Sequence, residues 1–321
     1  MPTLLLDHPS FAKHRTAGGH PERPDRYRVV EAALRQPQFD TLVRERAEIA
    51  DLATTRYVHS NRYVDELEAA RPAEGAEGTG GAGGAGGYVY LDGGDTMMEP
   101  STWEVVLRGV GGTLQAIDSV LTGRVQNAFV ACRPPGHHAE TERAMGFCLF
   151  NNISIGARHA QREHGVQRVA IVDFDVHHGN GTQQIFYSDA DVLYASTHQM
   201  PLFPGTGAVG ETGVGNIFNS PLRPGDGGAQ LRAAFQQRIL PALEGFAPEL
   251  ILVSAGFDAH ERDPLGSLTM TADDFGWVTR ELLNAAEKHC DGRLVAVLEG
   301  GYDLRGLADS VVAHVGELMK G

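Results

Sequence analysis

The chain has 321 residues, of which 42% are hydrophobic, and this is enough apolar material for a substantial core. Its 41 acidic and 27 basic residues give a formal net charge of −14 at pH 7, which argues against nonspecific binding to nucleic acid or to an anionic membrane. The sequence contains no apolar run of about 18 residues, so it predicts no transmembrane helix.

The N-terminus and the cysteines indicate the cellular compartment. Residues 1–14 contain one short apolar patch, ended by Asp7 and Pro9, and lack the basic segment and cleavage site of a secretory signal. The chain has only three cysteines and no CxxC pair, which disfavours a disulfide framework. We therefore expect a cytoplasmic protein, and the absence of targeting or regulatory extensions suggests a bacterial source.

A glycine-rich stretch interrupts the first third of the chain. Residues 75–87 hold eight glycines in thirteen positions, a composition that forms neither a stable helix nor a stable strand. We expect a flexible loop over residues 72–88, inside one domain that covers residues 1–321. A mobile rim over a binding site and a solvated insertion without function are both compatible with this composition.

Beyond this loop, predicted helices and strands alternate. The strand runs are short and apolar without alternation, which is typical of strands buried on both faces of a parallel sheet. Ser101 is an expected N-cap, and Thr271 with Asp274 resembles a capping box. The pattern predicts an α/β fold, a single-domain open parallel β-sheet with helices on both faces. In chain order the expected elements are helix 101–122, strand 127–132, helix 151–164, strands 168–174 and 191–196, helix 228–244, strand 249–255, helix 271–289 and strand 293–300.

Polar side chains follow every predicted strand. Ligands bind beyond the carboxyl ends of the strands in an open parallel sheet, so these segments predict one shared site. The five segments, in chain order, are "RPPGHHA", "DFDVHHGNG", "THQMPLFPGTG", "GFDAHERDPLG" and "EGGYDL".

The second segment has the composition of a metal site. Two neighbouring buried carboxylates repel each other unless a cation or a proton lies between them. A divalent metal bound by Asp175 and His177 resolves this repulsion, with Asp173 turned toward a histidine and Asp258 as third ligand. Two carboxylates and one imidazole leave a position for water, as in catalytic zinc sites, and Fe(II) also fits this ligand set. A single Asp or His here would be a helix cap or a satisfied core group.

The paired histidines suggest acid–base chemistry. A histidine that acts as a general base needs a partner that fixes its tautomer. We expect His137 to pair with Asp173 and His138 with Asn180, which leaves His138 closer to neutral and suited to be the base. The phenol of Tyr302 would stabilise an oxyanion opposite the metal, although a packed loop tyrosine is a common alternative.

Together these residues resemble the zinc-dependent histone deacetylase family, which has the arginase/deacetylase fold. Asn180 and Phe257 favour its class II branch and the bacterial relatives of that branch, since class I carries Asp and Ala there. The matching motifs run in family order and span most of the chain: "HPERPDR" (20–26), "RPPGHHA" (133–139), "GFCLFNN" (146–152), "DFDVHHGNGT" (173–182), "FPGTG" (203–207), "SAGFDAHERDPLG" (254–266) and "LEGGYD" (298–303).

The resemblance assigns a role to each matching position. It implies a zinc ion on Asp175, His177 and Asp258, with His138 as general base and then acid. It makes His137 an electrostatic partner and Tyr302 the oxyanion donor. It also implies a narrow substrate tunnel walled by Gly146, Phe147 and Phe203, an arginine near a product channel at Arg26, and a K⁺ site at Asp173, Asp175, His177, Ser196 and Thr197.

The resemblance also bears on the substrate. Leu265 matches a position at the tunnel rim where relatives that prefer acetylated polyamines carry a glutamate, so an acetyl-lysine peptide or protein is the expected substrate. The acidic segment 65–77 is an alternative source of charge for an acetylpolyamine, although a solvated helix end explains it as well. We expect no nucleic-acid or membrane partner, and the sequence is compatible with an oligomer.

Three other functions stay open. The chain could hydrolyse acetylpolyamines or other small acylated amines. It could be a non-catalytic module that binds acyl-lysine, but such a module would not need the complete set of ligands, histidines and tyrosine. A manganese ureohydrolase of the arginase type shares the fold but uses a two-metal cluster with more aspartates, which fits "GHH" and "GGY" poorly.

Overall fold

The computed structural model describes residues 2–73 and 87–321. Its centre is a parallel sheet of eight strands in the order β2-β1-β5-β10-β9-β6-β7-β8. The expected open parallel sheet is therefore confirmed. Most of the loop expected over residues 72–88 lies outside the described residues. The strands are β1 (Thr3–Asp7), β2 (Val43–Arg46), β5 (Asn127–Val130), β6 (Val169–Asp173), β7 (Val192–Gln199), β8 (Ile217–Leu222), β9 (Leu250–Ala255) and β10 (Leu294–Leu298).

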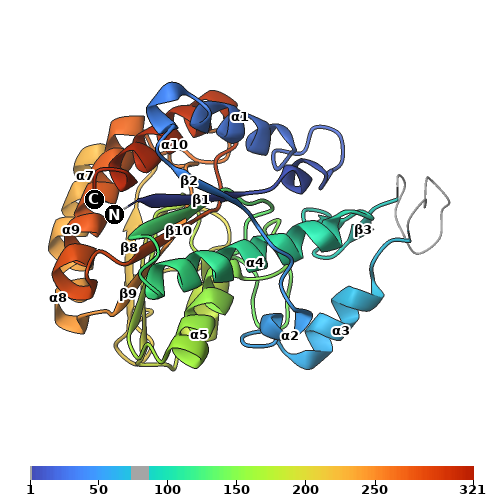
Figure 1. Cartoon of the computed structure of the whole chain (residues 1–321), viewed down its shortest axis with the longest axis horizontal. Coiled ribbons are helices and arrows are strands. Elements are labelled where there is room, and N and C mark those ends of the chain that lie inside the picture. Colours follow the sequence, from blue (N-terminus) through green and yellow to red (C-terminus); the bar gives the residue numbers. More distant parts are fainter. Residues whose placement is uncertain (1, 74–86) are drawn as a thin grey trace.

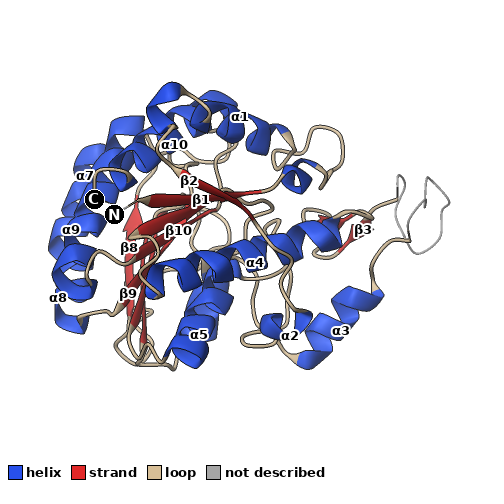
Figure 2. Ribbon diagram, in the orientation of Figure 1, coloured by secondary structure: helices blue, strands red, loops and turns tan. Residues whose placement is uncertain are grey.

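Helices cover both faces of this sheet, as expected (Figure 1). One face packs against α1 (Asp25–Leu34), α7 (Gly228–Ala234), α8 (Leu240–Phe246), α9 (Ala272–Cys290) and α10 (Leu304–Leu318). The other face packs against α4 (Thr102–Leu121), α5 (Asn152–His164) and α6 (Asn180–Phe186). Two small helices, α2 (Leu52–Thr55) and α3 (Asn61–Ala69), and a separate two-stranded ribbon of β3 (Val89–Tyr90) and β4 (Met97–Met98) lie outside this sheet (Figure 2).

The central strands explain the absence of alternation in the sequence. In β6, Ala170 and Val172 belong to the core under α9 and α10, whereas Val169 and Ile171 belong to the core under α4 and α5. Successive side chains of a strand point to opposite faces, so both sets must be apolar when both faces are covered.

The strands at and near the edges were missed by the sequence analysis. The apolar patch near the N-terminus forms β1, whose Leu4, Leu5 and Leu6 are buried between β2 and β5. The edge strand β2 reads "VRER" because only alternate residues are partly covered. Its charged side chains hide the strand pattern, and they also protect the edge from pairing with another chain.

The four predicted helices have boundaries close to those expected, with two differences, whereas α1, α2, α3, α6 and α10 were not predicted. The helix expected over residues 228–244 contains a π-helical turn at Phe235–Ile239, between α7 and α8. Ser101 precedes α4 but its side chain makes no capping hydrogen bond, because its hydroxyl contacts Glu99 instead. At the start of α9 the expected capping-box contact between Thr271 and Asp274 is present: the backbone N–H of Thr271 donates to the Asp274 carboxylate at 2.9 Å.

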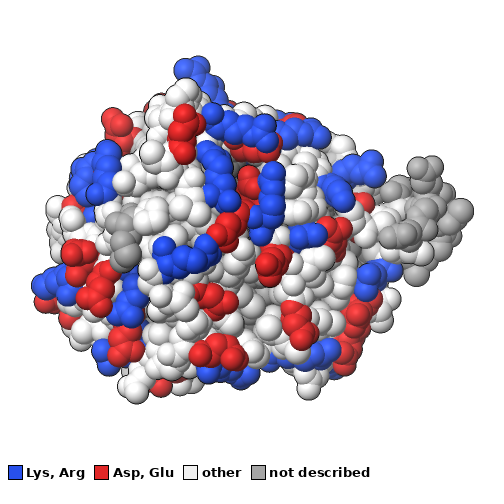
Figure 3. Space-filling model, in the orientation of Figure 1, with Lys and Arg blue, Asp and Glu red and all other residues white. Residues whose placement is uncertain are grey.

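The distribution of charged side chains and the state of the cysteines agree with the sequence analysis. On the face drawn in Figure 3, acidic and basic side chains lie interspersed and form no large patch of one sign. Cys132, Cys148 and Cys290 are all free and buried. Among the helices of residues 2–73 and 87–321, none combines the length and apolarity needed to cross a bilayer.

Candidate active site

The predicted site residues gather at the carboxyl ends of neighbouring strands. Strand β6 ends at Asp173; its neighbour β9 ends at Ala255, and β10, on the other side of β9, ends at Leu298. The loops that follow these strands carry the carboxylates and the tyrosine, and the loop after β5 carries the paired histidines. The parallel sheet thus brings together segments that are up to about 165 residues apart in the sequence.

Asp175, His177 and Asp258 form a compact buried cluster. Nδ1 of His177 lies 3.1 Å from Oδ1 of Asp175 and 3.1 Å from Oδ2 of Asp258. Burial and the nearby charge of Asp175 raise the pKa of Asp258 to about 7. Two buried carboxylates converging on one imidazole nitrogen are stabilised when a cation lies among them, so these three residues fit a divalent metal.

The backbone holds both carboxylates in place. The N–H of Val176 donates to Oδ1 of Asp258 at 2.7 Å, and the N–H of Gly300 donates to Oδ2 of Asp175 at 2.8 Å. A Cβ atom at Gly300 would lie 2.1 Å from Asp258 Oδ2, and one at Gly256 would lie 2.0 Å from Asp175 Oδ2. These two positions must therefore be glycine for the cluster to form.

Both expected histidine pairs are present beside this cluster. Nδ1 of His137 lies 2.9 Å from Oδ2 of Asp173, and Nδ1 of His138 lies 2.8 Å from Oδ1 of Asn180. The amide of Asn180 is oriented by its Nδ2, which donates to Glu140 at 2.8 Å. Its oxygen therefore accepts from His138, so Nδ1 of that ring carries the proton and Nε2 keeps its lone pair.

The two imidazoles have opposite electrostatic surroundings. Burial lowers the pKa of His137, but the Asp173 and Asp175 carboxylates outweigh burial and hold this pKa well above its ordinary value. Burial, with the charges of His137 and His177, holds the pKa of His138 well below its ordinary value. His137 is therefore suited to carry a positive charge, and His138 to accept a proton.

The structure adds two residues that the sequence analysis did not assign. The hydroxyl of Tyr194 donates to Oδ2 of Asp173 at 3.1 Å, and Oε2 of Glu299 accepts from the backbone N–H groups of Gly136 and His137 at 2.6 and 3.1 Å. Glu299 thus holds the loop of the paired histidines, and Tyr194 holds the carboxylate that pairs with His137. Glu299 lies in the "LEGGYD" motif, but its partners are backbone groups of a distant loop, and the sequence gives no signal for them.

Tyr302 is held by a carboxylate that was also missed. Oδ2 of Asp263 accepts from the backbone N–H of Tyr302 at 2.6 Å, and Oδ1 accepts from the N–H of Leu265 at 3.0 Å. The guanidinium of Arg26 lies 4.8 Å from the centre of the Tyr302 ring. Burial raises the pKa of Tyr302 well above its ordinary value, so the phenol stays protonated and can donate a hydrogen bond.

A pocket of about 260 Å³ leads to these groups. Phe203 is 45% exposed, and the centre of its ring lies 5.1 Å from that of His138; the ring centres of Phe147 and Tyr302 are 5.8 Å apart. All four predicted tunnel residues line the pocket, together with two residues that were not predicted, Asp95 and Leu202. The full lining is Asp95, His138, Gly146, Phe147, His177, Leu202, Phe203, Leu265 and Tyr302.

The residues expected to bind K⁺ are also neighbours. Strand pairing places Ser196 opposite Asp173, and Thr197 follows on the same strand. The hydroxyl of Ser196 is 2.8 Å from Nδ1 of His198. In the described part of the chain, the buried hydroxyl of Thr197 has no hydrogen-bond partner. This arrangement fits the predicted cation site.

Comparison with known proteins identifies the family of this chain. The family model described as "Histone deacetylase domain" matches residues 20–318. The chain therefore belongs to the histone deacetylase family, and the predicted family is confirmed.

Individual relatives agree with this membership. The chain is 38% identical over 313 residues to a probable deacetylase of Archaeoglobus fulgidus, covering 95% of this chain and 83% of the relative. It is 40% identical over 305 residues to a histone deacetylase-like amidohydrolase of Pseudomonas aeruginosa, covering 93% of this chain and 77% of the relative. The crystal structure of the HDA15 HD domain matches with a TM-score of 0.90 and 34% identity, covering 99% of this chain and 88% of that one.

Proposed function

We propose that this chain is a metal-dependent amidohydrolase that removes acetyl groups from Nε-acetyl-lysine in peptides or proteins, within a single catalytic domain. One observation carries the proposal: a divalent-cation ligand set, a neutral imidazole and a protonated phenol meet at one pocket. The pocket is lined by aromatic and aliphatic groups, which suit the apolar stem of a lysine side chain. Zn²⁺ is the proposed ion and Fe²⁺ is an alternative, with K⁺ proposed beside Ser196 and Thr197.

The proposed roles follow from the geometry of each group. When bound to Asp175, His177 and Asp258, a divalent cation would polarise the acetyl carbonyl and make water more acidic. Nε2 of His138 takes a proton from the attacking water, because its lone pair is free and burial keeps the ring neutral. His137, paired with Asp173, supplies positive charge next to the reacting centre.

The hydroxyl of Tyr302 and the proton held by His138 then act as the bonds form and break. Water adds to the carbonyl carbon, and the hydroxyl of Tyr302 donates a hydrogen bond to the oxygen that becomes negative. His138 returns its proton to the amide nitrogen, the C–N bond breaks, and acetate and the free amine are released. No covalent bond to the protein is needed.

One residue of the pocket lining supports acetylpolyamines as a second substrate class. Asp95 lines the pocket together with Leu265, so a carboxylate is present where a second cationic amine of an acetylpolyamine could lie. Leu265 itself favours acetyl-lysine, because an apolar side chain offers that amine no partner. We therefore keep acetylpolyamine hydrolysis as the alternative.

The proposal is tested by turnover of an acetyl-lysine peptide and of N8-acetylspermidine by the same zinc-loaded protein. We expect faster turnover of the peptide, loss of activity with a chelator, and recovery on adding Zn²⁺. The His138→Ala variant should keep its zinc and lose most turnover. Faster hydrolysis of acetylspermidine would replace the substrate assignment, and full activity of His138→Ala would contradict the mechanism. Zinc-containing protein that turns over neither substrate would favour an acyl-lysine binding module.

A further inference from the structure

A second group of metal-ligating side chains lies away from the active site. Asp118 is in the last turn of α4, and His159 and His164 are on α5, with His164 as its last residue. Both helices run back to the amino ends of the strands that follow them, β5 and β6. The group therefore lies at the opposite end of the sheet from the active site and has no part in the proposed reaction.

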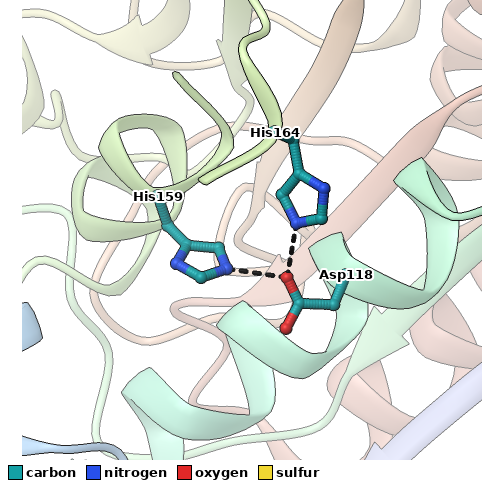
Figure 4. A group of neighbouring side chains, drawn as sticks. All are labelled: Asp118, His159 and His164. Atoms are coloured by element: carbon teal, nitrogen blue, oxygen red, sulfur yellow. Dashed lines mark hydrogen bonds and ion pairs between the residues drawn. The ribbon is translucent and has the colours of Figure 1, made fainter. Parts of the chain in front are cut away.

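The three side chains converge on one point, as Figure 4 shows. Nε2 of His159 lies 2.7 Å from Oδ1 of Asp118, and Nε2 of His164 lies 2.6 Å from the same oxygen. The two rings meet edge to face with their centres 5.7 Å apart. Two imidazole nitrogens and a carboxylate oxygen are thus brought together by two helices that are packed against each other.

The surroundings leave this group accessible to an ion. The side chains of His159 and His164 are 12% and 21% exposed, and that of Asp118 is 50% exposed, so water can reach one side. Nearby arginines are engaged elsewhere: Arg158 pairs with Asp189 at 2.6 Å, and Arg162 lies over the ring of Tyr57. Among the described residues, no lysine or arginine forms an ion pair with Asp118.

We propose that Asp118, His159 and His164 form a second metal site that binds a late first-row divalent cation such as Zn²⁺ and joins α4 to α5. Two histidines and one carboxylate are a ligand set that these metals bind, and water can complete the coordination. The carbonyl ends of both helices face this region, and they favour a positive charge there.

The present spacing needs only a small adjustment to accept an ion. Metal–ligand bonds of about 2.0–2.1 Å in a tetrahedral site place ligand atoms about 3.4 Å apart. Oδ1 of Asp118 lies 2.7 Å from Nε2 of His159 and 2.6 Å from Nε2 of His164. The carboxylate must therefore move away from the two rings by less than about 1 Å to admit the ion. Its half-exposed position allows this movement without disturbing the core. Without an ion, the same three groups form a hydrogen-bonded cluster.

The test is the number of Zn²⁺ ions bound per chain, measured by elemental analysis after equilibration and removal of free metal. We expect two ions for the wild type and one for the His159→Gln/His164→Gln variant, with deacetylase activity unchanged in that variant. His289→Gln is the matched control, because His289 pairs with a single carboxylate on the surface, and it should keep two ions. Asp118→Asn retains an acceptor oxygen for both rings but loses the charge, so it should bind the second ion more weakly.

A variant of the catalytic ligand Asp258 separates this site from the active site. Asp258→Asn should retain one ion, and added Zn²⁺ should raise its melting temperature. The combined Asp258→Asn/His159→Gln/His164→Gln variant should show neither effect. The proposal is overturned if the wild type and the folded His159→Gln/His164→Gln variant bind the same number of ions, or if Asp258→Asn shows no zinc-dependent stabilisation. Neither of these results would affect the proposed deacetylase activity.

Discussion

At the scale of single residues, the active site depends on groups that set the protonation state of others. His137 and His138 are adjacent in sequence and their rings are 4.1 Å apart, yet one pairs with a carboxylate and the other with an amide. The sequence predicted both pairs, because the motif that follows the next predicted strand along the chain offers one Asp and one Asn. It could not predict Asp263, Tyr194 or Glu299, because each acts on a group whose position depends on the complete fold.

The role of the phenol can be tested directly. Tyr302→Phe should lower kcat by about 10²–10³-fold with little change in zinc content, because it removes one donor to the oxyanion and no proposed metal ligand. The measurement is steady-state kinetics on an acetyl-lysine peptide, with Tyr187→Phe, an exposed tyrosine, as control. A kcat within a few-fold of the wild type would rule out the oxyanion role.

The preference between acetyl-lysine peptides and acetylpolyamines is expected to depend on Leu265 at the pocket rim. Leu265→Glu should raise kcat/KM for N8-acetylspermidine and lower it for an acetyl-lysine peptide, because a carboxylate beside Asp95 attracts a second cationic amine. The ratio of the two kcat/KM values is the measurement, and Leu265→Gln separates charge from size. If the glutamate and glutamine variants give the wild-type ratio, selectivity is determined elsewhere.

At the scale of elements, prediction succeeded for the five strands in the middle of the sheet and failed at and near its edges. The five apolar runs each correspond to a strand of the sheet, whereas β1, β2 and β8 were missed. Strand β8 contains Asn219 and Pro221, and β2 is largely charged, so neither has the composition of a buried strand. Helix α4 was found despite three glycines, because its apolar positions recur at helical spacing.

One of these glycines is required by packing. A Cβ atom at Gly111 would lie 2.1 Å from the backbone oxygen of Glu48, in the segment after β2. Gly111→Ala should therefore destabilise the protein by about 2–3 kcal/mol despite the higher helix propensity of alanine. Urea denaturation gives the free energy of unfolding. Gly316→Ala on α10 is the matched control, because no atom lies within 4 Å of its added Cβ, and it should stabilise by up to about 1 kcal/mol. Equal effects of the two substitutions would contradict this explanation.

At the scale of the whole molecule, a buried ion-pair network joins the N-terminal segment to the sheet. Both carboxylate oxygens of Glu22 accept from Arg133, at 2.7 and 2.6 Å, and Arg26 lies 3.3 Å away. Another nitrogen of Arg133 donates to the backbone oxygens of Phe11 and His14. These residues come from segments more than 100 positions apart, so the motif "HPERPDR" could be recognised in the sequence but its partners could not.

This network should make stability depend on pH. Burial raises the pKa of Glu22, but the charge of Arg133, with its neighbours, outweighs burial and lowers that pKa to about 2. A carboxyl whose pKa is lower in the folded state stabilises the protein above its ordinary pKa of 4.5, and this contribution is lost as the pH falls toward 2. Glu22→Gln should cost about 3–5 kcal/mol near pH 7, because it leaves Arg133 buried without a counter-charge.

The check is the difference in unfolding free energy between wild type and Glu22→Gln, measured by urea denaturation from pH 7 to pH 3. This difference should shrink below about pH 4.5, because the Glu22 carboxyl of the unfolded wild-type chain takes up a proton there while that of the folded chain stays ionised down to about pH 2. Glu142→Gln is the control, because the exposed pair of Glu142 with Arg62 contributes less than about 1 kcal/mol. A difference for Glu22→Gln that stays constant over the whole range would show that the charge of Glu22 is not responsible.

Asp263 has a consequence for the exchange of loops between relatives. Its two oxygens accept from the backbone N–H groups of Leu265 and Tyr302, which both line the pocket, so one side chain fixes both backbones. A chimera whose replaced rim segment lacks this carboxylate would lose the hydrogen bond that positions Tyr302. Such a chimera, although designed to change selectivity, would therefore lose turnover. Grafts that begin after residue 263 keep that anchor, and they give a route to new substrates on an intact catalytic centre.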